Sequence, residues 1–321
     1  MTEISFVVIC YNHARYAARV ARYLRLQKDV EDAEYIFVDD GSTDGTTEAL
    51  QAATAGWPNT TVYRQENKGP SNAMNKGLSL ATGTYVKLVG GDDLLHPDAT
   101  RVLRAALIAE DAVYAFGKLD GFDMDRDISD EDYWTSLMKP IVKAERQRID
   151  DPLRFLVKGM TYNPSCVLMR RDHVIAAGGS DESLFVEDFS LSLRMALRGT
   201  FVSISEFVAY GPSDDDQRLS HDNAQTLHDM NAALSGLLRD HPELSRRRRN
   251  MIARSALGRG WKWARRHEGK NIFSRIGLMN TLANIRIFGY PVFDSSVGMM
   301  DTACKPFREQ RTLRGPKVSA Q

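Results

Sequence analysis

Long apolar runs and closely spaced cysteines are both absent from this sequence of 321 residues. No apolar run approaches the ~18 residues that can span a bilayer, so we expect no transmembrane helix. The chain opens with Met1 and two polar residues before a predicted strand, so we also expect no signal peptide. Its three cysteines, Cys10, Cys166 and Cys304, are odd in number and lack metal-ligand spacing. This pattern is typical of reduced thiols in a cytoplasmic protein.

Net charge is absent too, because 42 Lys and Arg balance 42 Asp and Glu. The balance conceals an asymmetry along the chain. Residues 241–290 hold 12 basic and 2 acidic side chains, which leaves 30 bases against 40 acids elsewhere. An acidic body therefore carries a basic C-terminal segment. With 43% apolar residues, the chain can fill the core of one large domain that carries an extension.

Apolar strands alternate with helices over the first half of the chain. Residues 4–10, 35–38 and 85–89 predict buried strands, and residues 14–27 predict an amphipathic helix. This alternation predicts a parallel α/β sheet with right-handed crossovers. The turn after the first strand, Cys10-Tyr11-Asn12-His13, contains no Gly-x-Gly-x-x-Gly, which argues against a dinucleotide-binding turn.

Pairs of carboxylates follow two of the predicted strands. Asp39-Asp40 follows the strand at 35–38, and Asp92-Asp93 follows the strand at 85–89 after two glycines. Parallel strands end at one edge of a sheet, where open α/β sheets bind their ligands. Adjacent carboxylates there are costly unless a cation or hydrogen bonds neutralise them. Each pair by itself fits either a ligand site or a loop in which the carboxylates only hold the turn.

The second half of the chain is less regular. Residues 117–150 are rich in acids but lack the Gly and closing Glu of a calcium loop, so we expect a solvated surface loop. Strands are predicted at 165–169 and 201–210. A helix is predicted at 189–198, and Glu187-Asp188 precede it. These two carboxylates suit a helix N-terminus for electrostatic reasons alone, or one of them could act as a base.

Taken together, residues 4–212 resemble the family 2 glycosyltransferases, which have the GT-A fold. The resemblance rests on five motifs in order, namely Val7-Val8-Ile9-Cys10-Tyr11-Asn12, Val38-Asp39-Asp40-Gly41-Ser42-Thr43-Asp44-Gly45-Thr46, Asn67-Lys68-Gly69 with Asn75-Lys76-Gly77, Gly91-Asp92-Asp93, and Glu187-Asp188. It implies an α/β fold, a single Rossmann-like GT-A domain over residues 1–222. Residues 1–115 would bind the donor and residues 116–222 the acceptor. Residues 223–321 would then be a basic helical extension with a disordered end.

The resemblance also implies an activity and a set of site residues. The implied reaction is an inverting transfer of a sugar from a nucleotide-diphosphate sugar, first of all a UDP-sugar, to an acceptor hydroxyl in polysaccharide or glycolipid synthesis. Asp188 would be the catalytic base, and Asp92 would bind Mn²⁺ or Mg²⁺. The implied substrate-binding residues are Cys10, Tyr11, Asn12, Asp39, Asp40, Asn67, Gly69, Asn75, Gly91, Asp93 and Glu187.

The chain departs from the family pattern at one place that matters. Gly90 stands where the DXD motif has its first aspartate, so the ion would take most of its ligands from the donor diphosphate and water. The chain also lacks a Gln-x-x-Arg-Trp motif, which argues against a processive polysaccharide synthase. Two alternatives stay open. One is an inactive nucleotide-binding or scaffold protein of this fold. The other is a sugar nucleotidyltransferase, which would need a Gly-rich phosphate loop after the first strand.

Helices are predicted in the basic C-terminal segment, at 223–240, 246–268 and 272–288. In the last of them, Ile272, Ile276, Met279, Ala283 and Ile287 fall at helical spacing. One interpretation is that these helices pack on the catalytic domain. The other is a peripheral contact with the inner face of the plasma membrane, which would bring the enzyme to a lipid-linked acceptor. No nucleic-acid partner is expected, because no reading motif accompanies the bases.

Overall fold

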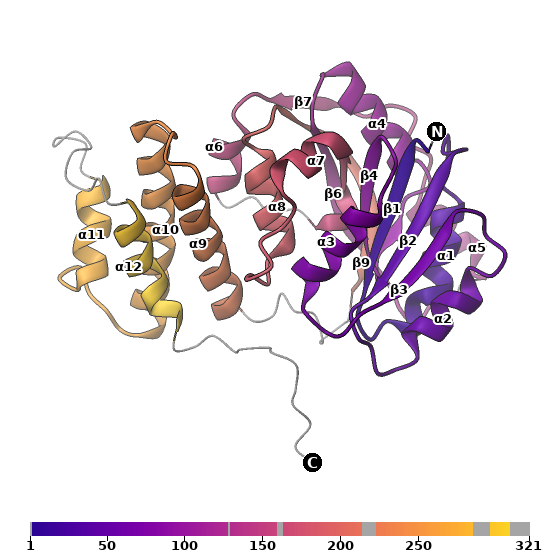
Figure 1. The fold of residues 1–321 in the computed structure, drawn as a ribbon, viewed down its shortest axis with the longest axis horizontal. Coiled ribbons are helices and arrows are strands. Elements are labelled where there is room, and N and C mark those ends of the chain that lie inside the picture. Colours follow the sequence, from indigo (N-terminus) through magenta and orange to yellow (C-terminus); the bar gives the residue numbers. More distant parts are fainter. Residues whose placement is uncertain (1, 128, 159–162, 214–222, 285–295, 309–321) are drawn as a thin grey trace, which may run out of the picture.

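The structure is a computed structural model that describes residues 2–127, 129–158, 163–213, 223–284 and 296–308. The strands of these residues form one nine-stranded sheet in the order β3-β2-β1-β4-β8-β6-β9-β5, and β7 pairs with β9 (Figure 1). The strands are β1 (Ile4–Cys10), β2 (Ala33–Asp39), β3 (Thr60–Arg64), β4 (Tyr85–Gly90), β5 (Leu94–Leu95), β6 (Tyr114–Phe122), β7 (Arg146–Ile149), β8 (Val167–Arg170) and β9 (Phe201–Pro212).

The predicted parallel sheet is confirmed for β1 to β4, and beyond them the sheet contains both directions, since β6 and β9 also pair in parallel. β1 lies between β2 and β4, and both of these neighbours run parallel to it. β8, by contrast, is antiparallel to β4 and to β6, so the sheet is mixed. The apolar run of β8 could not reveal this, because a strand buried on both faces reads alike in either direction.

Helices cover both faces of the sheet. In chain order they are α1 (Ala17–Arg25), α2 (Thr46–Ala53), α3 (Pro70–Leu80), α4 (Ala99–Ala109), α5 (Glu131–Leu137), α6 (Pro152–Val157), α7 (Arg171–Ala177), α8 (Glu187–Met195), α9 (Asn223–Asp240), α10 (Arg246–His267), α11 (Arg275–Asn284) and α12 (Ser296–Arg308), with short 3-10 turns η1 (Ala14–Tyr16) and η2 (Pro164–Cys166). Side chains of α1, α2, α4 and α5 share one apolar core, and those of α3, α6, α7 and α8 share the other.

The alternation of side chains along β1 explains why two cores exist. Phe6 and Val8 belong to the core under α1 and α4, whereas Val7 belongs to the core under α3 and α8. Successive side chains of a strand point to opposite faces, so a continuous apolar run is what a strand needs when both faces are covered. Gly77 of α3 lets this helix approach closely, since a Cβ there would lie 2.3 Å from Cγ1 of Val7.

The acidic stretch 117–150 is more ordered than the expected surface loop. β6 continues through it to Phe122, α5 lies at Glu131–Leu137, and β7 pairs with β9. Trp134 of α5 is buried against Phe122 and anchors this region. One aromatic side chain can thus fix a segment whose other residues are mostly charged.

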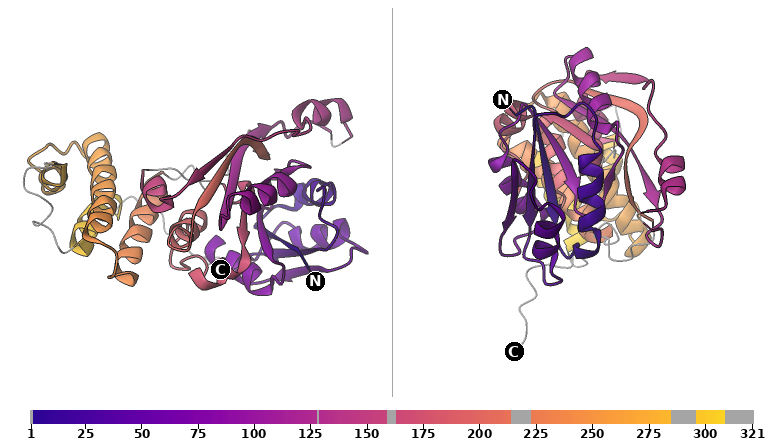
Figure 2. Two further views of the ribbon diagram at one scale, coloured as in Figure 1. Left: turned by 90° about the horizontal axis from the view of Figure 1, so that it is seen from above. Right: turned by 90° about the vertical axis from the view of Figure 1, so that its right-hand side faces the viewer.

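The C-terminal helices continue the core under α3 and α8. α9 packs on α8, and α10 and α12 pack on α9 in turn. Figure 2 shows α10 to α12, in orange and yellow, at one end of the molecule when it is seen from above. Among the described residues, no helix is both long and apolar enough to cross a bilayer. The end predicted to be disordered lies outside the described residues beyond Arg308.

Candidate functional site

The turns that follow β1, β2 and β4 meet at one edge of the sheet. In the parallel register Cys10 pairs with Asp39, and Ile9 pairs with Gly90, so the three strands end at the same level. The predicted site residues Tyr11, Asp40 and Asp92 all lie just beyond these ends. Strand order alone therefore brings three of the predicted motifs together, at the place where open α/β sheets bind ligands.

The turn after β1 is bonded to the loop after β2. The Asn12 backbone, with a φ of 56°, donates to Oγ of Ser42 over 2.8 Å, and Oδ1 of Asn12 accepts from the Thr43 backbone over 2.9 Å. Asp39 is fully buried, and its carboxylate accepts from the backbone and hydroxyl of Ser42 and from the Thr47 hydroxyl. The Asp39 carboxylate shapes this loop, and a contact with the donor stays a prediction.

Asp40 holds a second loop in place. It is 3% exposed, and its oxygens accept from Nε2 of Gln65 over 2.8 Å and from the backbones of Lys68 and Gly69 over 2.9 and 2.8 Å. Burial raises the pKa of this carboxyl, and the three hydrogen bonds work against that rise. Asp40 thus anchors the predicted donor loop 67–69 to the end of β2.

The loop between α7 and α8 is bonded to α3. Nδ2 of Asn75 donates to the Ser180 carbonyl and to Oε1 of Glu182, both over 2.9 Å, and Oδ1 of Asn75 accepts from the Ser180 backbone over 2.8 Å. Asn72 donates to the other Glu182 oxygen over 2.8 Å. Asn75 was predicted to contact the donor. In the structure its amide holds the segment that leads to Glu187 and Asp188.

The turn after β4 is unusually tight. A Cβ on Gly90 would lie 2.8 Å from Oδ2 of Asp93 and 3.0 Å from Oδ1 of Asp92. A Cβ on Gly91 would lie 2.6 Å from Sγ of Cys10. The contacts with Asp93 and Cys10 are closer than a real Cβ allows without a shift of its neighbours. Gly90 stands where the family motif has an aspartate. The short distances show that the carboxylates of Asp92 and Asp93 fold back toward this position.

Asp92 and Asp93 differ in their surroundings. Asp93 is 3% exposed and accepts from Oγ of Ser165 over 2.6 Å, whereas Asp92 is half-buried. The described residues contain no group of three or more His, Cys, Asp and Glu side chains that could hold a metal ion. One or two hard oxygen donors still fit Mg²⁺ or Mn²⁺, because these ions readily keep waters and phosphate ligands. Such a set does not fit Zn²⁺, which needs three or four protein ligands.

Lys87 is not among the predicted site residues, although it is the one charged residue in the apolar strand 85–89. It is fully buried, and its Nζ donates to the carbonyl of Ser165 and to that of Leu88, the latter over 3.3 Å. Burial lowers the pKa of Lys87 to about 7, and the nearby Cys166 and Asp93 oppose the shift. Ser165 thus links the Lys87 ammonium to Asp93. A lone lysine in a buried strand was the available signal for this link.

Glu187 and Asp188 form the first turn of α8. Oδ1 of Asp188 accepts from the Phe189 backbone over 2.6 Å. Desolvation raises the pKa of both carboxyls, and the neighbouring Asp188 charge raises that of Glu187 further. A carboxylate with a raised pKa is a better proton acceptor than an ordinary one, so the pair has the chemistry of a general base.

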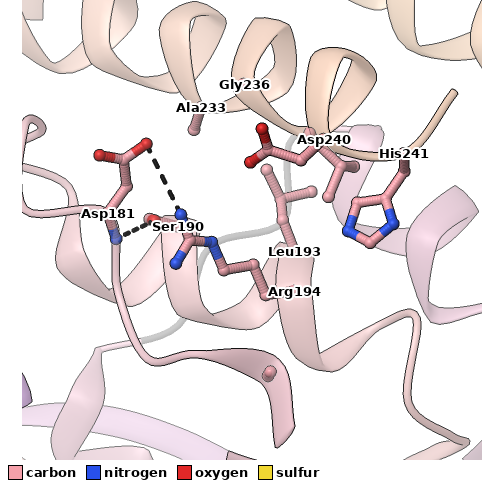
Figure 3. A pocket seen from close by; sticks show the side chains of 10 residues that line it. Asp181, Ser190, Leu193, Arg194, Ala233, Gly236, Asp240 and His241 are labelled. Carbon is pink, nitrogen blue, oxygen red and sulfur yellow. Dashed lines mark hydrogen bonds and ion pairs between the residues drawn. The ribbon is translucent and has the colours of Figure 1, made fainter.

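The described structure also has a cavity of about 190 Å³ on the other side of α8, between α7, α8 and α9 (Figure 3). Asp181, Ser190 and Arg194 line one wall, and Asp240 and His241 line the opposite one. Arg194 and Asp181 form an ion pair with 3.7 Å between their charged atoms. None of the predicted site residues lines this cavity, so it is separate from the carboxyl edge of the sheet.

Known proteins share both sequence and fold with this chain. Residues 5–176, more than half of the chain, match the family model for "Glycosyl transferase family 2". "Glycosyltransferase GlyG" of Streptococcus pneumoniae serotype 4 is 33% identical over 121 residues, or 37% of this chain and 40% of that protein. "Chondroitin synthase" of Escherichia coli is 34% identical over 99 residues, or 31% of this chain and 14% of that protein. The matched stretches therefore span less than half the length of these relatives.

Solved structures agree over nearly the whole chain. The crystal structure of S. aureus TarS 1-349 in complex with UDP-GlcNAc superposes with a TM-score of 0.58 at 15% identity, and covers 97% of this chain and 93% of that one. Mannosyltransferase PcManGT from Pyrobaculum calidifontis, in complex with GDP-Man and Mn²⁺, gives a TM-score of 0.54 at 15% identity, with 96% and 88% covered. At such identities the likeness shows the fold, and it confirms the predicted GT-A architecture.

Proposed function

The chain belongs to glycosyl transferase family 2, and on that premise we propose that it transfers a sugar from a UDP-sugar to an acceptor hydroxyl with inversion. The observation that carries the proposal is the separation of two carboxylate sites on different elements. Asp92 lies at the end of β4, and Asp188 lies in the first turn of α8. One carboxylate on the donor side and one base on the acceptor side suit a single displacement. Retaining glycosidases instead pair two carboxylates about one bond.

The donor would lie over the turns after β1 and β2. Tyr11 is 44% exposed at the end of β1, so its ring is accessible to a base. Asn12, Asp39 and Asp40 hold the surrounding turns, and Cys10, Asn67 and Gly69 would line the donor site with them. Support for a nucleotide donor comes from the fold neighbours, whose structures contain UDP-GlcNAc and GDP-Man.

A divalent ion would be held by Asp92 together with the donor diphosphate. Support comes from the Mn²⁺ in the mannosyltransferase complex and from the half-buried Asp92 carboxylate. When bound, such an ion neutralises the charge that develops on a leaving diphosphate. Asp93 would keep the turn in shape through Ser165, and Gly91 would allow its close approach to Cys10.

Asp188 would take the proton of the acceptor hydroxyl as that oxygen attacks the anomeric carbon. The new bond joins the acceptor oxygen to this carbon, and the bond from the carbon to the diphosphate oxygen breaks. Glu187 beside it raises the cost of a second negative charge, so the pair would act with one proton bound. Asn75 would position this pair by holding the segment before α8.

We assign the donor side to residues 1–115, the acceptor side to residues 116–222 and an extension to residues 223–321. The product would be part of a cell-surface polysaccharide or glycolipid. This setting is supported by relatives such as "Succinoglycan biosynthesis protein ExoO" of Rhizobium meliloti, which is 32% identical over 123 residues. We place the reaction in the cytoplasm, which is supported by the three buried cysteines, since they form no disulfide with one another.

A donor panel tests the proposal. The protein is mixed with UDP-, GDP- and dTDP-sugars, with and without Mn²⁺, and both thermal shift and release of nucleoside diphosphate are measured. We expect one nucleotide class to raise the melting temperature, more so with Mn²⁺, and to be hydrolysed slowly without acceptor. Binding without any release of diphosphate, even with saccharide and lipid-linked acceptors, would instead indicate an inactive nucleotide-binding protein.

A further inference from the structure

The basic segment 241–290 divides into two parts with different surroundings. In the first part, Ile252 and Ala256 of α10 are fully buried, and Oγ of Ser255 donates to the Val157 carbonyl over 2.5 Å. Nη1 of Arg259 donates to Oδ1 of Asn231 over 2.6 Å. This part packs on α6 and α9, so here the predicted packing against the domain is correct.

The second part presents its bases to solvent. Lys262, Arg265, Arg266, Lys270 and Arg275 are exposed, and none forms an ion pair with any residue that the structure describes. Glu268 is the one acid between residues 262 and 284. These side chains therefore give the end of α10 and the start of α11 a net positive charge.

Apolar side chains are exposed among these bases. Ile272 and Phe273, before α11, are 56% and 76% exposed, and Leu278 and Leu282 on α11 are 47% and 45% exposed. The helix predicted from residue 272 begins only at Arg275, so Ile272 lies before it rather than on its apolar stripe. The predicted Ile287 lies outside the described residues.

α11 is apolar on two faces, and the residues that the structure describes cover one of them. Ile276 is 7% exposed, and Met279 and Ala283 pack against the core. A water-facing helix normally keeps polar residues outside its buried stripe, whereas α11 places Leu278 and Leu282 there. Bases beside exposed apolar side chains are the composition of surfaces that lie in the headgroup region of a bilayer.

The position of this surface relative to the site is also favourable. In Figure 1 the connection between α10 and α11 lies on the lower side of the molecule. On this same side α8 begins and β1 ends. A bilayer that contacts this connection would therefore lie on the side at which α8 begins, with Glu187 and Asp188 in its first turn.

We propose that residues 262–282 form a contact surface for an anionic lipid bilayer, in which Ile272, Phe273, Leu278 and Leu282 enter the headgroup region and the surrounding bases bind anionic headgroups. The contact would hold the site close to a membrane-linked acceptor. Only this role, holding the site close to an acceptor, rests on the proposed function. Charge complementarity selects the bilayer as the occupant, because anionic lipids attract each nearby Lys or Arg by about 1 kcal/mol, or roughly fivefold in binding.

Vesicle binding of the full-length chain tests the surface without any need for activity. The protein is floated with vesicles of phosphatidylglycerol mixed with phosphatidylcholine, and with vesicles of phosphatidylcholine alone, over a series of salt concentrations. We expect binding to the anionic vesicles only, and weaker binding as salt rises. Two double variants probe the two kinds of contact. Ile272→Ser with Phe273→Ser removes apolar insertion, and Lys262→Glu with Lys270→Glu removes attraction to the headgroups. Each should weaken binding by at least about tenfold.

A matched control changes exposed residues of the same kinds elsewhere. Val142 is 92% exposed and Lys143 follows it on the catalytic domain, so Val142→Ser with Lys143→Glu should leave vesicle binding unchanged. Diphosphate release with a soluble acceptor should be the same in all three variants, which separates this test from that of the proposed function. Equal binding by variants and wild type, or no binding to anionic vesicles, would overturn the proposal. A dimer seen by light scattering that dissociates in the Ile272–Phe273 variant would assign the surface to a second copy of the chain instead.

Discussion

The carboxylates after β2 and those at the start of α8 differ in the hydrogen-bond donors around them. Asp39 and Asp40 are 0% and 3% exposed, and each accepts three hydrogen bonds from nearby donors. Glu187 and Asp188 adjoin one another at the start of α8, and desolvation raises the pKa of both. Burial raises the pKa of Asp40 as well, so the two pairs differ chiefly in their hydrogen-bond donors. The first pair holds two loops through these donors, whereas Asp188 accepts a hydrogen bond from the Phe189 backbone at the start of its own helix.

The largest expected effect separates the two carboxylates of the second pair. Asp188→Asn should lower the rate of transfer by about 10²- to 10⁴-fold, the usual contribution of a general base, while nucleotide binding stays intact. Glu187→Gln is the matched change and should cost far less. Steady-state transfer assays and nucleotide titrations measure both quantities. If Glu187→Gln is the inactive variant and Asp188→Asn is active, the base has been assigned to the wrong residue.

A smaller effect concerns pH. A base works only when deprotonated, so the raised pKa of Asp188 should make kcat/KM rise with pH through a range above that of an ordinary aspartate, by about tenfold per unit below the inflection. The same raised pKa favours the protonated folded state, so its contribution to stability is present at low pH and is lost as pH rises through the folded-state pKa. Rate and unfolding profiles from pH 4 to 8 would show both trends. An acid inflection at or below the usual aspartate range would contradict the assignment.

The smallest expected effect is a change in stability, and it concerns Asp40 of the first pair. Asp40→Asn replaces one of two oxygens, each of which accepts from a backbone N–H group, by an amide nitrogen that cannot accept. We expect a loss of about 1–3 kcal/mol in the free energy of unfolding. Glu66→Gln changes an exposed carboxylate of the same loop and should cost less than about 0.5 kcal/mol. Urea unfolding compares the two. Equal stabilities would mean that Asp40 does not hold the loop.

The sequence predicted the parallel half of the sheet well, because its strands carry unbroken apolar runs and its helices carry clear spacing. It predicted that the turns after β1, β2 and β4 meet, since parallel strands end together. It could not predict that Asn75 bonds to Ser180, because that contact joins residues 105 positions apart. The direction of β8 could not be predicted for the same reason, because the residues of a strand do not by themselves specify which strand it pairs with.

The basic C-terminal segment taught a different lesson. Its composition fitted both packing on the domain and contact with a membrane. In the structure, the first part of the segment packs on α6 and α9. Arg259 and Lys262 are one turn apart on α10, yet Arg259 bonds to Asn231 whereas Lys262 is exposed. Composition reports the total charge of a segment, but only the neighbours of each side chain decide which charges are available.

The short strand β5 has a mechanical consequence for the whole molecule. It follows Asp93 directly and pairs with β9, Leu94 with Tyr210 and Leu95 with Ala209. On the other flank of the same turn, Ser165 bonds to Gly90 and Asp93. The turn is therefore clamped from both sides by residues of the second half of the chain. Opening the proposed donor and acceptor halves about a hinge at this point would break both clamps. We therefore expect the loops around the rim, rather than a rigid-body motion, to adjust to different substrates.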